Sequence, residues 1–192
     1  MKARWLWIAA LVLMPLTSAQ AADAIDRLMS TLSAQPGGTV RFVERRYLAM
    51  LDAPVVSRGE MQYRAPDWLE RRTLSPRPER LLLDKDTLTL ERDKRRITMP
   101  VNQRPEVEAF VASVRSTLQG DRATLERHFT LALQNSAARW TLTLVPRESR
   151  LLGIVKRIDI SGAAGAVDRI DYTQADGDRT EMRLEPLAAG KP

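Results

Sequence analysis

Apolar residues recur at two different spacings along the first half of the chain. Between Ile25 and Leu32 they lie three or four residues apart, which predicts a short amphipathic helix that ends at Pro36-Gly37-Gly38. From Val40 to Pro100, apolar and polar residues alternate, with turn sequences such as Asp52-Ala53-Pro54 between the runs. Alternation of this kind is typical of strands with one buried face. The region therefore predicts six short strands in an antiparallel meander.

The alternation is interrupted once, by a helical pattern that begins near Pro105 and ends at Gly120. Asp121 is placed to cap a further brief turn that ends at His128. Strands resume at Phe129, so about eleven strands and two or three helices are expected in all. The apolar stripe of the longer helix is made by residues at i, i+3, i+4, i+7 and i+11, which are Val107, Phe110, Val111, Val114 and Leu118.

Most predicted strands are apolar on one face and polar on the other, as in Arg-Trp-Thr-Leu-Thr-Leu at 139–144. Two or three helices are too few to cover both faces of so large a sheet, but they can lie across one concavity. A sheet of about eleven strands does not stay flat and is expected to curl. The predicted fold class is therefore α+β, mainly β, with an incomplete, unclosed antiparallel β-barrel and a helical lid over an apolar concave face.

Composition excludes several classes of function. The 192 residues include no Cys and one His, so a disulfide framework, a thiol nucleophile, Cys-ligated zinc and a two-histidine metal site cannot be built. A catalytic triad would have to use His128, and no nucleophile is placed beside it in the sequence pattern. We therefore expect no catalytic residues, no metal site and no cofactor, and we do not expect an enzyme.

The first 21 residues are expected to be a secretory signal peptide. Lys2 and Arg4 precede an apolar run from Trp5 to Met14, and Ala19-Gln20-Ala21 supplies the small residues that a signal peptidase reads. That run is about half of the roughly 20 residues that span a bilayer. Cleavage would leave residues 22–192 as a single domain and lower the net charge from +6 to +4, because both basic residues are removed. The expected compartment is the periplasm, with no lipid anchor and no nucleic-acid partner.

A series of short motifs follows in a fixed order along nearly the whole predicted mature chain. Phe42-Val43-Glu44-Arg45-Arg46 comes first, and Ser57-Arg58-Gly59-Glu60-Met61-Gln62-Tyr63-Arg64-Ala65-Pro66-Asp67 comes next. An Asp-rich hairpin at Asp84-Lys85-Asp86-Thr87-Leu88 precedes Leu118-Gln119-Gly120-Asp121 and the strand from Trp140 to Pro146. In order and spacing these motifs resemble the periplasmic outer-membrane lipoprotein carrier family (LolA-like).

The resemblance implies a soluble carrier whose cavity shields the acyl chains of a lipoprotein or other lipidated cargo during transfer towards the outer membrane. An inner-membrane exporter would donate the cargo, an outer-membrane acceptor would receive it, and we expect the carrier to be a monomer. Ten acyl CH₂ groups cost about 8 kcal/mol to expose to water, a factor of about a million in equilibrium. Unaided transfer is therefore negligible. The alternative is a periplasmic sensing or scaffold module that binds a lipidated ligand or a regulatory partner on the same fold.

The expected cavity residues are apolar side chains of the alternating strands, which an ordinary core would explain as well. The middle helix would supply the lid with Phe110, Val111 and Val114. The cavity set is Phe42, Met61, Tyr63, Trp68, Leu88, Leu90, Met99, Phe129, Leu131, Trp140, Leu142, Leu144, Ile158 and Ile160.

Two departures from the family pattern point to a divergent branch. Ala65 stands where typical members have an Arg that latches the lid, and Arg64, one residue earlier, is expected on the opposite face of its strand. The Phe-x-Phe-x-Pro-Pro-x-Gly tail of typical members is also missing. The cargo could accordingly be a lipid, a glycolipid or a lipid-linked pigment precursor. Arginine doublets at 45–46, 71–72 and 95–96 either meet anionic head groups or a partner's acidic surface, or form solvated strand faces.

Overall fold

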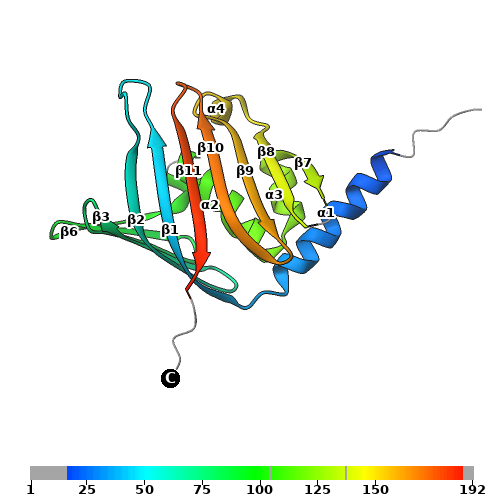
Figure 1. Cartoon of the computed structure of the whole chain (residues 1–192), viewed down its shortest axis with the longest axis horizontal. Coiled ribbons are helices and arrows are strands. Elements are labelled where there is room, and N and C mark those ends of the chain that lie inside the picture. Colours follow the sequence, from blue (N-terminus) through cyan, green and yellow to red (C-terminus); the bar gives the residue numbers. More distant parts are fainter. Residues whose placement is uncertain (1–16, 104, 137, 188–192) are drawn as a thin grey trace, which may run out of the picture.

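A computed structural model describes residues 17–103, 105–136 and 138–187, and its main element is one large antiparallel sheet (Figure 1). The helices of the described residues are α1 (Thr17–Ser33), the 3₁₀ turn η1 (Val101–Gln103), α2 (Pro105–Gln119), α3 (Arg122–His128) and α4 (Ser149–Leu152). The strands are β1 (Gly37–Tyr47), β2 (Val55–Arg64), β3 (Trp68–Ser75), β4 (Glu79–Asp84), β5 (Thr87–Arg92), β6 (Arg95–Pro100), β7 (Phe129–Asn135), β8 (Trp140–Pro146), β9 (Val155–Ala163), β10 (Ala166–Gln174) and β11 (Arg179–Pro186).

The sheet consists of two meanders joined by one long-range pairing. Its strand order is β6-β5-β4-β3-β2-β1-β11-β10-β9-β8-β7, so only β1 and β11 are distant in sequence. That pairing runs from Val40 opposite Pro186 to Tyr47 opposite Arg179. Strands β6 and β7 are the two edges and do not pair with each other within the described residues, so the barrel is unclosed. The predicted eleven-stranded, mainly β fold is confirmed.

The helices gather on one side of the sheet. Figure 1 shows the sheet in front with α2 and α3 behind it, while α1 lies at one end, where it contacts α2, α3 and β7. Gly120 makes the close approach of α1 and α2 possible, because its φ is +69° and a Cβ there would clash with the carbonyl of Met29. Asp121 caps α3 as predicted, since its side chain accepts a hydrogen bond from Thr124 N–H. The one-turn helix α4 was not predicted, because four residues show no period.

Side chains alternate between the helix-facing, concave face of the sheet and its outer face. On β1 the concave residues include Phe42, which is 1% exposed and packs against Gly59 of β2. A side chain at Gly59 would strike both the Phe42 ring and the Arg72 carbonyl, so the glycine of the 57–67 motif lets three strands approach. The outer face carries ion pairs such as Arg157 with Asp159, so it is polar.

Candidate functional site

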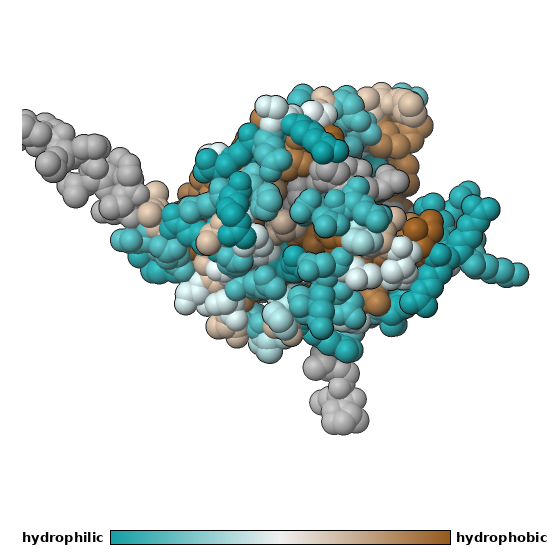
Figure 2. All heavy atoms as spheres, turned by 180° about the vertical axis from the view of Figure 1, so that it is seen from behind, coloured by the Kyte–Doolittle hydropathy of each residue, from teal (hydrophilic) through white to brown (hydrophobic). Residues whose placement is uncertain are grey.

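The concave face is not filled everywhere, and two apolar chambers lie between it and α2. Leu69 and Val114 line both chambers, which therefore adjoin each other. We call them the α1 chamber, which Leu32 of α1 helps to line, and the hairpin chamber, which Leu83 and Leu88 of the β4–β5 hairpin help to line. Seen from the helical side, Figure 2 shows a mostly hydrophilic surface with hydrophobic atoms visible between the polar groups.

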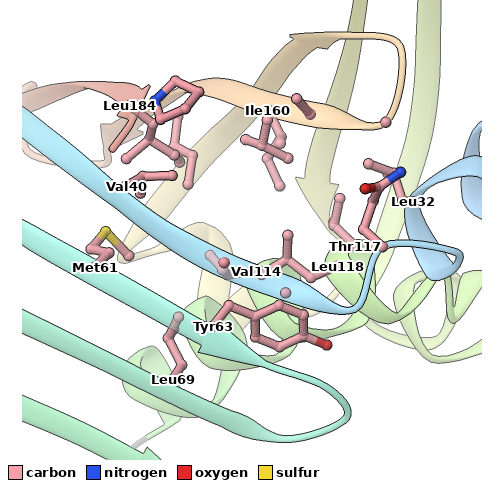
Figure 3. A pocket seen from close by; sticks show the side chains of 18 residues that line it. Leu32, Val40, Met61, Tyr63, Leu69, Val114, Thr117, Leu118, Ile160 and Leu184 are labelled. Atoms are coloured by element: carbon pink, nitrogen blue, oxygen red, sulfur yellow. The ribbon is translucent and has the colours of Figure 1, made fainter. Parts of the chain in front are cut away.

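The α1 chamber encloses about 960 Å³, counting the space at its open mouth. Its lining comes from α1, α2 and the strands β1, β2, β3, β9, β10 and β11. Figure 3 shows Met61, Tyr63 and Val114 among the side chains around the space. Burial raises the pKa of Tyr63, and the charge of Asp67 adds to this while that of Arg115 opposes it. The lining residues are Leu32, Gln35, Gly37, Gly38, Val40, Met61, Tyr63, Leu69, Val114, Thr117, Leu118, Ile160, Gly165, Ala166, Val167, Ile170, Leu184 and Pro186.

The hairpin chamber encloses about 1050 Å³ on the same basis and lies between β3 to β5 on one side and β9 and β10 on the other. Phe110 of α2 reaches across it, with its ring 5.9 Å from the ring of Tyr172. Arg71 is the one charged residue in its lining within the described part of the chain. The lining residues are Leu69, Arg71, Leu81, Leu83, Leu88, Val107, Phe110, Val111, Val114, Ile154, Val155, Ile158, Tyr172 and Gln174.

The predicted cavity residues divide between the chambers and the solid core. Met61, Tyr63 and Ile160 line the α1 chamber, and Leu88 and Ile158 line the hairpin chamber. The three lid residues all face these chambers. The members that line neither chamber are Phe42, Trp68, Leu90, Met99, Phe129, Leu131, Trp140, Leu142 and Leu144.

Of the residues outside the chambers, Phe42, Phe129, Trp140, Leu142 and Leu144 are buried, whereas Trp68, Leu90, Met99 and Leu131 are half-buried. Phe129, Leu142 and Leu144 have no exposed surface and belong to the same core cluster as Leu125 of α3 and Leu28 of α1. The helices α1 and α3 therefore fill the concavity at the β7–β8 end.

Trp68 and Arg64 form a separate pair on the outer face of the sheet. The Arg64 guanidinium lies 4.5 Å from the centre of the Trp68 ring. Strand alternation places both side chains on the face of the sheet opposite to that of Tyr63 and Leu69, which line the α1 chamber. Arg64 therefore does not point towards α2.

The sequence-based set omitted several chamber residues that carry the same signal. Val40 lies two residues from Phe42, Leu184 lies two residues from Met182, and Leu69 lies two residues from Arg71. Each therefore shares a strand face with that neighbour. Leu118 belongs to the apolar stripe of α2 that was recognised in the sequence. Extending the alternation along each strand would have found the first three, and the apolar stripe of α2 would have found Leu118.

Arg115 and Gln119, two side chains of α2, donate hydrogen bonds to two turns between strands. Arg115 donates a 2.8 Å hydrogen bond to the Lys85 carbonyl in the β4–β5 turn and lies 3.2 Å from Asp86 Oδ1. Gln119 Nε2 donates to the Pro66 carbonyl at 2.5 Å, an oxygen that also accepts from the Tyr63 hydroxyl at 3.0 Å. These contacts join α2 to two hairpins although position 65 is Ala.

A site of this kind has the features of a binding pocket for an apolar ligand: apolar walls, a cover and few polar groups. The single His lies elsewhere, with His128 Nδ1 3.7 Å from Glu148 Oε1. In the part of the chain that the structure describes, no three His, Cys, Asp or Glu side chains gather to hold a metal ion.

A family model described as outer membrane lipoprotein carrier protein LolA-like matches residues 16–190. The chain belongs to this family. The resemblance recognised from the motifs is thereby confirmed. A search of curated proteins found no match to this LolA-like chain.

Solved structures of the LolA-like fold match over most of the chain at low sequence identity. MucB is 15% identical with a TM-score of 0.50, and the match covers 91% of this chain and 60% of MucB. A LolA superfamily protein from Nitrosomonas europaea is 9% identical with a TM-score of 0.44, over 88% of this chain and 94% of that one. The lipoprotein LppX of Mycobacterium tuberculosis is 8% identical with a TM-score of 0.44, over 86% and 98%. At such identity the likeness to MucB shows the fold alone.

Among the described residues, no helix has both the length and the apolar character that crossing a membrane requires.

Proposed function

We propose that this LolA-like protein is a periplasmic carrier that holds the acyl chains of a lipoprotein or other lipidated cargo in the two chambers beneath α2. An inner-membrane exporter supplies the cargo, and an acceptor at the outer membrane receives it. The observation that carries the proposal is a pair of adjoining apolar chambers beneath α2, a helix that Arg115 and Gln119 join to two strand turns through exposed hydrogen bonds.

The chambers suit a flexible chain better than a rigid compact ligand. Their walls combine Met61, Leu69 and Leu88 with aromatic side chains from β2, β10 and α2, so they present apolar surface with adaptable shapes. Each CH₂ group moved from water into such surroundings contributes about 0.8 kcal/mol. The cost of opening the lid is small by comparison, which allows release to an acceptor that offers equal apolar burial.

The test is to fill the hollow without disturbing the sheet. Val114→Trp places a large ring where the chambers adjoin, and we expect it to abolish uptake of a fluorescent fatty acid and to remove any co-purified lipid seen by native mass spectrometry. Val145→Trp adds the same ring on the partly exposed outer side of β8 and should leave uptake intact. Wild-type protein that neither carries nor takes up any acyl ligand would refute the carrier.

The second candidate is a sensing or scaffold module that binds a lipidated ligand or a regulatory protein and does not ferry it. MucB, with which this chain shares a fold, has been solved in complex with MucA. The two functions differ in release. A carrier transfers a bound acyl ligand to acceptor vesicles or an acceptor protein, whereas a sensor retains the ligand until its partner changes.

A further inference from the structure

One charged side chain interrupts the apolar wall of the hairpin chamber. Arg71 lies on β3 between Met61 of β2 and Leu81 of β4, and its side chain is 17% exposed. Its guanidinium lies 3.1 Å from Glu44 Oε1, 3.8 Å from Glu79 Oε1 and 4.5 Å from the centre of the Phe42 ring. Because a guanidinium has five N–H donors, these two ion pairs still leave donors, Nε among them, for another acceptor.

One buried polar atom of this side chain has no hydrogen-bond partner among the described residues. It is Arg71 Nε. Leaving such a group unpaired is unfavourable. A ligand with charged oxygens beside Arg71 would give this donor an acceptor.

Arg71 also faces a second, polar space, which we call the basic depression. It borders the hairpin chamber, since Arg71 lines both. Four cationic side chains face two carboxylates in the basic depression, so its charge is positive. The cationic side chains are Arg46, Arg71, Arg77 and Arg92, and the carboxylates are Glu44 and Glu79.

We propose that the hairpin chamber and the basic depression bind one amphiphile whose anionic head group, a carboxylate or a phosphate, is held by Arg71. The acyl chain lies in the hairpin chamber, and the head group sits in the basic depression. Arg suits this role because its planar fork matches carboxylate and phosphate oxygens. The Glu44 ion pair and the Phe42 ring hold the guanidinium in place beforehand. The proposal rests on the proposed function, because it requires the hollow to accept an acyl chain.

Dodecanoate, dodecyl phosphate and dodecanol have the same chain length and differ in head group. Comparing their affinities therefore distinguishes binding of the head group from binding of the chain. In displacement of a bound fluorescent acyl probe, we expect both anions to bind at least about tenfold more tightly than dodecanol, the gain expected of one charge-assisted hydrogen bond. The variant Arg71→Met with Glu44→Gln leaves no unpaired carboxylate and should give all three ligands similar affinity. Arg41→Met, on the outer face of β1, should keep the difference.

Several results would overturn the proposal. Equal affinities in the wild type, or an undiminished difference in the Arg71→Met, Glu44→Gln variant, would exclude the head-group site while leaving an acyl carrier intact. Inorganic phosphate that binds as tightly as dodecyl phosphate would show an anion site independent of the hollow. If the protein bound neither the three ligands nor the probe, the proposed function itself would be contradicted.

A second variant keeps the test decisive if the first one does not fold, which circular dichroism would reveal. Arg77→Gln removes positive charge from the rim of the basic depression and leaves Arg71 and the Arg92–Glu79 ion pair in place. We expect it to weaken the binding of dodecyl phosphate and dodecanoate several-fold while the affinity for dodecanol stays the same. An equal loss for dodecanol would contradict the head-group site.

Discussion

Glu70 is 3% exposed on the outer face of β3, and two arginines bind its carboxylate. Arg72 Nε lies 2.9 Å from one oxygen, and Arg80 donates to the other. Burial by itself raises the pKa of Glu70, but the hydrogen bonds and charges of Arg80 and Arg72 outweigh it and hold the pKa below its usual value. Ionised Glu70 therefore stabilises the folded state above the carboxyl pKa of the unfolded chain, and this stabilisation is lost as the pH falls through the lower, folded pKa.

Glu70→Gln tests this linkage. We expect it to reduce the free energy of unfolding by about 1–2 kcal/mol at pH 7, a modest figure because both arginines are partly exposed. The difference from wild type should shrink as the pH falls below about 4, because the Glu70 carboxyl of the unfolded chain takes up a proton there, and it should vanish once the lower, folded pKa is passed. Urea unfolding at several pH values measures it, and Glu185→Gln at an exposed position is the control. A pH-independent difference would show that packing, not ionisation, is responsible.

At the level of single residues, the sequence predicts which face a side chain occupies better than it predicts what covers that face. Leu144 and Ile158 pair across β8 and β9 on the same concave face. Ile158 lines the hairpin chamber, whereas Leu144 is enclosed by the core under α1 and α3. Alternation is local and cannot distinguish them, because the difference arises from where helices distant in sequence come to lie. The same local rule did place Arg64 on the outer face.

Among the elements, α2 is the one whose movement would open both chambers. Among the described residues, its polar contacts with the hairpins are the Arg115 bonds to the β4–β5 turn and the Gln119 bond to Pro66. Both lie at the surface, so water can replace them at low cost. They were not predictable from the sequence, since the family pattern directed attention to the strand position at Ala65 and not to the helix.

Arg115→Gln combined with Gln119→Ala should loosen the lid. We expect exchange of a bound acyl probe to become about tenfold faster, because about 1.4 kcal/mol of closing interaction is removed. Stopped-flow displacement measures the rate. Arg122→Gln, which breaks contacts between α3 and α1 at the other end of the concavity, should leave the rate close to wild type. An unchanged rate in the double variant would mean that α2 does not gate the chambers.

Helix α1 begins at Thr17, whereas signal-peptide cleavage is expected after Ala21. Removal of the first 21 residues leaves the part of the helix that packs in the core, from Ile25 to Leu32. Arg122 donates to the Ala22 carbonyl at 3.0 Å and to Asp26 at 2.9 Å, so the new first turn stays attached to α3. We therefore expect periplasmic protein to have the intact mass of residues 22–192 and a melting temperature independent of residues 17–21. A mass that includes residue 1 would contradict the cleavage.

For the molecule as a whole, an unclosed sheet leaves two strand edges that could pair with another copy. The β7 edge is in contact with α1 and α3. The β6 edge has no such cover among the described residues, and its first four residues, from Arg95 to Thr98, are exposed. Arg95 and Arg96 place like charges there, and Pro100 ends the strand without a donor. These features favour a monomer, with charge rather than a covering element protecting the β6 edge.

Neutralising that edge should allow two copies to pair through β6. In sedimentation velocity over a range of concentrations we expect the wild type to remain monomeric, while Arg95→Thr with Arg96→Val forms a dimer whose share rises with concentration, because strand pairing no longer brings arginines of two copies together. Arg41→Thr with Arg183→Val removes the same charge from interior strands, whose backbone groups are already paired, and should stay monomeric. Equal association of both variants would assign the effect to net charge and not to the open edge.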